Sequence, residues 1–128
     1  MSTASLRARY LGDTVTTASP QRLLVMLYDR LALDLERAQT AIAAGDREQA
    51  TEQLQHAQEV VFGLLESLQV DAWEGAPRLA ALYNWLITEL GQAVVKGDLR
   101  RVADCRKIVD PLRDAWREAA ASLAAAPA

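Results

Sequence analysis

Residues 19–46, with the sequence SPQRLLVMLYDRLALDLERAQTAIAAGD, contain both ends of one long amphipathic helix. Ser19 suits the N-cap because its hydroxyl can accept an orphan backbone N–H, and Pro20 suits the first helical position because proline has no N–H. Gly45 supplies the left-handed conformation that ends a helix, and Asp46 caps the next helix. Between these signals, apolar residues alternate in steps of four and three, as one buried helix face requires: Leu24, Tyr28, Leu31, Leu35, Ala38 and Ile42.

Three further helices follow the first, which we expect to run from Pro20 to about Ala44. The loop 70–77, which contains Gly75 and Pro77, separates the second helix from the third, and a second Gly-Asp pair, residues 97–98, separates the third from the fourth. The four apolar seams span Leu24–Ile42, Ala50–Leu68, Leu79–Ala93 and Val102–Leu123.

Four helices of roughly 20 residues, each about 30 Å long, pack as antiparallel neighbours when their connections are short. We therefore predict an all-α fold, an antiparallel up-down-up-down four-helix bundle over residues 19–124. Residues 1–18 are polar and irregular, so we expect a flexible N-terminal segment there. We expect residues 125–128 to form a frayed tail.

Composition and charge narrow the functional class. A chain of 128 residues forms one domain, and a net charge of -3 argues against non-specific binding of nucleic acid. Cys105 is the only cysteine, which excludes an intramolecular disulfide and favours a reducing compartment. The N-terminus does not resemble a secretory signal, and no stretch approaches the roughly 18 apolar residues that span a bilayer. We expect a cytoplasmic protein that neither binds nucleic acid nor inserts into a membrane.

His56, the only histidine, shares one helix face with Glu52 and Glu59. A di-metal site in a helical bundle needs Glu-x-x-His on two helices and two further Glu, which a single histidine cannot supply. The sequence shows no Ser-His-Asp set, Gly-rich phosphate loop or zinc-binding cysteine pair. We predict no enzymatic activity, no metal and no cofactor, and we interpret the face around His56 as a solvated charged stripe.

Two other functions stay open from the residues alone. One is a histidine phosphotransfer-like signalling bundle that uses His56, although the flanking glutamates would repel a phosphoryl group. The other is a helical bundle that only associates with itself.

Apolar residues remain outside the four seams. Phe62 and Trp85 lie off the main seams, and Trp73 lies in the loop between the second and third helices. Such side chains either cover loops and core edges or form a groove for an amphipathic helix of a partner. The other surplus apolar positions are Leu23, Val25, Met26, Leu27, Val60, Leu65, Leu82, Ile87, Val94, Leu99 and Ile108.

Pro111 lies inside the pattern of the fourth helix. Proline at this position removes a backbone hydrogen bond and clashes with the preceding turn, at a cost of roughly 3 kcal/mol. A tolerated kink and a bend that widens a groove against a neighbouring helix are both compatible with the sequence.

An ordered set of short motifs extends over almost the whole chain. Its members are Tyr10, Val15, Thr17-Ala18-Ser19-Pro20, Leu23, Met26-Leu27-Tyr28-Asp29, Ala57, Val60-Val61, Ser67-Leu68, Leu79, Leu82-Tyr83, both Gly-Asp turns and Leu112-Arg113-Asp114-Ala115-Trp116. In order and spacing this set resembles the FliS family, the flagellar export chaperones for flagellin. The chain departs from the family pattern at Gln21, Arg30, Glu74-Gly75, Arg78 and Asn84-Trp85.

The resemblance implies a cytoplasmic chaperone that binds the disordered C-terminal segment of flagellin, prevents premature polymerisation and helps to deliver flagellin to the flagellar export gate. It also implies an irregular N-terminal segment that lies over the client groove, so we expect Tyr10, Leu11 and Val15 to dock reversibly on the bundle. Whether the client-free protein forms a homodimer is left undecided by the sequence. The predicted partner-binding residues are Tyr10, Leu11, Val15, Tyr28, Phe62, Tyr83 and Trp85.

Overall fold

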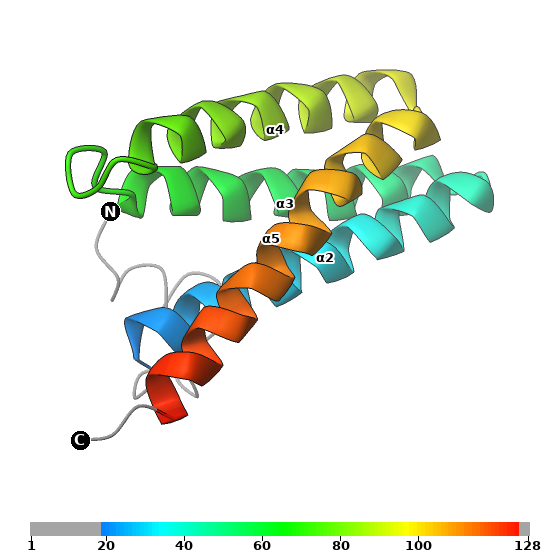
Figure 1. The fold of residues 1–128 in the computed structure, drawn as a ribbon. Coiled ribbons are helices and arrows are strands. Elements are labelled where there is room, and N and C mark those ends of the chain that lie inside the picture. The colour runs from blue at the N-terminus through cyan, green and yellow to red at the C-terminus, as the bar shows by residue number, and fades with distance from the viewer. Residues whose placement is uncertain (1–18, 126–128) are drawn as a thin grey trace.

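The computed structural model describes residues 19–125, which form four α-helices and their connections. The helices are α2 (Pro20–Ala43), α3 (Arg47–Ser67), α4 (Ala76–Lys96) and α5 (Leu99–Ala125). Successive helices run in opposite directions and pack in chain order, and α5 returns to pack against α2 (Figure 1). The predicted all-α antiparallel bundle is confirmed. The expected flexible segment 1–18 and most of the expected frayed tail lie outside the described residues and stay predictions.

The helix ends follow the predicted capping signals. The side chains of Ser19, Asp46 and Asp98 each accept a backbone N–H from the first turn of the helix that follows, at 3.0 to 3.2 Å. Gly45 and Gly97 have φ angles of 76° and 60°, a left-handed conformation that glycine adopts without steric cost. Both Gly-Asp turns therefore end one helix and begin the next.

Two boundaries differ from the expected ones. Pro77 lies in the first turn of α4 and not in the preceding loop, because the first N–H groups of a helix have no intrahelical acceptor and proline is tolerated there. Helix α5 extends to Ala125, one residue beyond the expected end of the bundle.

The core contains the predicted seams and some residues that the seams omitted. Leu23, Leu27 and Val60 are buried, whereas the sequence pattern placed them among the surplus apolar positions. Each helix in the bundle has two neighbours, so its buried stripe is wider than a single seam. The largest fully buried side chains are Tyr28, Tyr83, Leu27, Leu31, Leu35, Leu54, Leu86, Leu90, Val60, Val61, Val102 and Val109.

Tyr28 of α2 and Tyr83 of α4 are joined by a hydrogen bond of 2.8 Å between their buried hydroxyls. This bond crosses the interior between two helices that are not adjacent around the bundle. Trp116 of α5 packs against Tyr28, with ring centroids 6.3 Å apart and the planes tilted by 55°. Burial raises the pKa of both phenols, so both hydroxyls stay protonated.

Pro111 does not interrupt α5, which is helical on both sides of it. Its ring lies on the exposed side of the helix. The proline removes the amide donor that position 111 would otherwise supply to the preceding turn. Whether Pro111 bends α5 and widens a groove stays a hypothesis; the part of α5 beyond it borders both cavities described below.

We predict that Tyr28→Phe and Tyr83→Phe will each lower the free energy of unfolding by about 1–3 kcal/mol, because each leaves one buried hydroxyl without its partner. The free energy of unfolding of the double variant should fall by clearly less than the sum of the two single losses, since neither tyrosine hydroxyl then remains without a partner. Urea denaturation of the four proteins measures this coupling. Strictly additive losses would contradict it.

Cys105, a buried residue of α5, provides a second test of the core. Its thiol is fully buried, and burial, followed by the nearby Glu89 and Asp104, raises its pKa to about 12. Because the thiolate is the reactive form, we expect the folded protein to resist alkylation at pH 8 and to react rapidly in concentrated urea. Mass spectrometry after iodoacetamide treatment measures both states, and rapid labelling of the folded protein would show that the core opens at this point.

Candidate functional site

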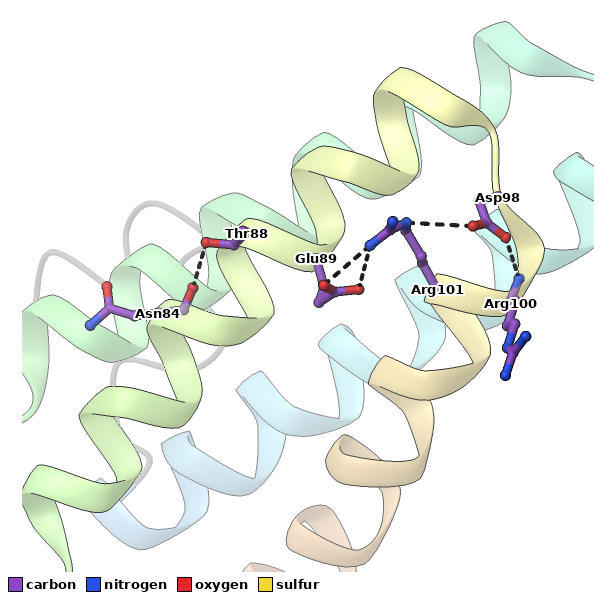
Figure 2. A network of polar contacts seen from close by, with 6 residues as sticks. All are labelled: Asn84, Thr88, Glu89, Asp98, Arg100 and Arg101. Carbon is purple, nitrogen blue, oxygen red and sulfur yellow. Dashed lines mark hydrogen bonds and ion pairs between the residues drawn. The ribbon is translucent and has the colours of Figure 1, made fainter.

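Helices α4 and α5 lie close together at the turn that joins them and diverge toward the other end of the bundle (Figure 1). An ion pair between Glu89 of α4 and Arg101 of α5, at 3.1 Å, connects the two helices near the turn. Figure 2 shows Arg101 between Glu89 and Asp98, which pairs with it at 3.4 Å and also caps the start of α5. In the described range 19–125, the ion pair between Glu89 and Arg101 joins α4 to α5 near their connecting turn.

The C-terminal half of α5 is attached to α2 instead. Arg117 donates to the carboxylate of Asp29 at 2.6 Å, and Trp116 packs on Tyr28. Earlier in α5, Arg106 donates to the side-chain oxygen of Gln39 at 2.7 Å. These contacts draw α5 toward α2, so the start of α4 and the end of α5 face each other across an open space.

Two cavities lie at this end of the bundle. The first, of about 500 Å³, is bordered by all four helices and the α3–α4 loop. The second, of about 400 Å³, lies between the start of α4 and the C-terminal half of α5. Trp73, Leu79 and Trp116 border both cavities. We call the two cavities together the apolar groove.

The lining of the apolar groove is almost entirely apolar. Of the described residues that border it, only Arg78 carries a charge. The first cavity is lined mainly by Leu24, Leu64, Leu68, Ala72 and Tyr83, with Ser67 and Gln69. The second is lined by Gly75, Arg78, Leu82, Leu112, Ala115 and Ala119. A concave apolar surface of this kind is typical of a site that accepts apolar side chains of a partner.

The predicted partner-binding residues fall into three groups. Tyr10, Leu11 and Val15 lie outside the described residues. Tyr28 and Tyr83 are core residues, and their hydroxyls bind each other. Tyr83 also borders the first cavity, whereas Tyr28 has no exposed surface and can act on a partner only by supporting the floor of the groove.

Phe62 and Trp85, the third group, are 44% and 39% exposed. Trp85 follows Leu82 by three residues and precedes Glu89 by four, so it lies on the α5 side of α4 and continues the rim of the apolar groove. Phe62 follows Gln58 by one turn, and Gln58 donates to the Ile87 carbonyl on α4. Phe62 is therefore on the side of α3 that faces α4, and it borders neither cavity of the apolar groove.

Sequence reasoning did not assign the α5 wall of the groove to a site. The sequence pattern placed Leu112 and Ala119 on the buried seam of the fourth helix, and Ala115 appeared only as a member of the Leu112–Trp116 motif. Ala115 and Ala119 follow Leu112 by three and seven residues, so all three lie on one helix face, which was the available signal. The pattern could not show that this face meets an open space and not a neighbouring helix.

Glu52 and Glu59 are exposed, as expected of a solvated stripe, whereas His56 is only partly exposed and its Nδ1 forms a hydrogen bond with Asp34 across the α2–α3 interface. Asp34 is fully buried and also accepts from Arg30 at 3.1 Å. Burial raises the pKa of the Asp34 carboxyl, and the neighbouring His56 and Arg30 oppose this rise. The three residues link α2 and α3, which gives His56 a structural role.

Neither a metal site nor a membrane span emerges from the described part of the chain. Between residues 19 and 125, no group of three or more His, Cys, Asp or Glu side chains is arranged to hold a metal ion. No helix in that range has the length and apolarity needed to cross a membrane.

Comparisons with known proteins agree along nearly the whole chain. The family model for the flagellar protein FliS matches residues 2–123. The flagellar secretion chaperone FliS of Bacillus subtilis (strain 168) is 32% identical over 114 residues, which cover 86% of this chain and 82% of that relative. The proteins of the same name from Salmonella typhimurium (strain LT2) and Escherichia coli (strain K12) are 30% and 29% identical, each over 83% of this chain and over 80% and 79% of the relative.

Proposed function

This chain belongs to the FliS family of flagellar secretion chaperones, which are not enzymes, and we propose that its client is the disordered C-terminal segment of flagellin. The observation that carries the proposal is the apolar groove, a concave and almost uncharged surface between α4 and α5. A disordered client loses chain entropy when it binds, so it needs a large apolar contact to compensate. The groove, with Trp85 on its rim, supports a contact of this kind.

The cellular role follows from the chemistry of that contact. A flagellin segment that lies on the chaperone as an amphipathic helix has its apolar face covered, so it cannot pair with other flagellin subunits. Binding in the bacterial cytoplasm would thereby prevent premature polymerisation. The complex would then present flagellin to the flagellar export gate. A single cysteine, which fits a reducing compartment, supports the cytoplasmic location.

A charge placed in the groove tests the proposal. Leu82 lines the second cavity and is not part of the buried core, so Leu82→Asp should fold normally. We expect this variant to bind a peptide of the cognate flagellin's C-terminal segment at least about tenfold more weakly, since a carboxylate would lie against apolar client side chains. Titration calorimetry measures the affinity, and co-purification with full-length flagellin checks the complex.

Val95→Asp is the matched control. Val95 lies on the same helix, is 73% exposed and borders neither cavity, so its change to aspartate should leave the affinity unchanged. If the unaltered protein binds neither the peptide nor flagellin, the proposed client is wrong. Equal losses for both variants would place the contact elsewhere on the bundle.

We further propose that Tyr10, Leu11 and Val15 dock on the bundle and compete with the client. This part of the proposal rests on the sequence, which has isolated apolar residues in an otherwise polar stretch. Deletion of residues 1–18 should then raise the affinity for the flagellin peptide, because no competing segment has to leave. Calorimetric titration of the shortened and full-length chains measures the difference, and identical affinities with unchanged bundle stability would argue against competition.

A further inference from the structure

Trp73 occupies an unusual position in the loop between α3 and α4. Its side chain is 50% exposed, although it borders both cavities of the apolar groove. The backbone on either side of it is fixed by two turns, in which Ala72 N–H donates to Gln69 O at 3.0 Å and Ala76 N–H donates to Trp73 O at 3.2 Å. The loop thus holds a large aromatic ring at the mouth of the groove.

Gly75 is the reason that the ring can lie where it does. A Cβ atom added at Gly75 would lie 1.9 Å from Cζ3 of Trp73 and 2.6 Å from Cη2, far inside van der Waals contact. The backbone of Gly75 has φ -77° and ψ -14°, which any residue can adopt. The glycine is therefore needed for the space that it leaves to the indole, not for its backbone freedom.

Trp73 is the most exposed of the three residues that border both cavities of the apolar groove. With Leu79 and Trp116, Trp73 borders the first cavity, which reaches Leu64 and Leu68, and the second, which reaches Leu82 and Leu112. An occupant that enters both cavities therefore lies beside the half-exposed indole. Apolar residues on one face of a helix recur every three or four residues, so one amphipathic helix can place successive anchors on either side of such a ring.

Charge narrows the choice of occupant. Arg78, in the first turn of α4, is the only charged residue among those described that border the groove, and no ion pair joins it to another residue in the range 19–125. A helix whose apolar anchors enter the two cavities would therefore bind best with a carboxylate beside this guanidinium.

We propose that Trp73, held over Gly75, is the specificity-determining residue of the apolar groove, and that it selects an amphipathic helix of the flagellin C-terminal segment with one apolar anchor in each cavity and an acidic residue beside Arg78. This inference rests on the proposed function. Tryptophan in a partly buried position commonly dominates binding energy, because a rigid aromatic surface becomes covered at little entropic cost.

The sharpest test moves the ring without removing it. Gly75→Ala keeps the backbone conformation and forces the indole away, so we expect about tenfold weaker binding of the cognate flagellin C-terminal peptide, with a changed tryptophan emission spectrum. Gly91→Ala is the matched control. Both substitutions add one methyl group, Gly91→Ala within α4 and Gly75→Ala at its N-cap. The Cβ at position 91 would meet only the flexible end of Gln58, at 3.2 Å, so the affinity should not change.

A double-variant cycle separates this role from a general loss of fold. Trp73→Ala should weaken binding at least as much as Gly75→Ala, and Gly75→Ala should have no further effect in the Trp73→Ala background, because both changes act through one ring. Thermal unfolding of each variant should stay close to that of the unaltered protein, since the indole is half exposed. Additive losses of affinity would overturn the proposal.

The proposed pairing between Arg78 and an acidic residue of the client is tested by exchanging the two charges. Arg78→Glu should weaken binding about fivefold or more, and a peptide with lysine in place of the matching acidic residue should recover most of that loss against the variant. If the unaltered chain binds no flagellin peptide, the proposed function fails. If it binds but Gly75→Ala and Gly91→Ala behave alike, or if Gly75→Ala alters only self-association in light scattering, the function stands and the role of Trp73 is overturned.

Discussion

The buried contact among Tyr28, Tyr83 and Trp116 is the interaction on which the rest of the structure depends. It joins α2, α4 and α5 at a single point, and it supplies the floor of the apolar groove. Because the two tyrosine hydroxyls satisfy each other, both phenol rings can be buried there without an orphaned hydroxyl. A more open packing at this point would leave the groove without a fixed shape.

The groove itself results from an imbalance in how α5 is held. Contacts with α2 extend from Gln39 to Asp29, whereas the polar contact with α4 is concentrated at Glu89, close to the connecting turn. Helices that are joined at one end and attracted to different neighbours at the other must diverge. The apolar side chains along the gap then lack a neighbour within the bundle, and the surface that results suits a partner helix and not a catalytic reaction.

Trp73 and His56 show that isolated residues are hard to interpret from sequence. An aromatic residue in a loop indicates only that part of its ring is covered, and here the ring lies in the space that Gly75, two residues away, leaves by having no Cβ. His56 has glutamates on its own helix face, yet its partner is Asp34 on the preceding helix. In both cases the decisive neighbour depends on how backbone segments meet in space, which a helical pattern does not contain.

The sequence by itself determined the class of fold, the number of helices and their ends. Capping residues, left-handed glycines and the apolar period act within a few residues, so they can be read from the chain directly. The sequence also indicated the family, because the family's short motifs occur in order along almost the whole chain. Only the tertiary structure decided which surplus apolar residues enter the core, as Leu23 and Val60 do, and which remain open, as Trp73 and Trp85 do. That outcome depends on how the four helices pack against one another, which no local pattern records.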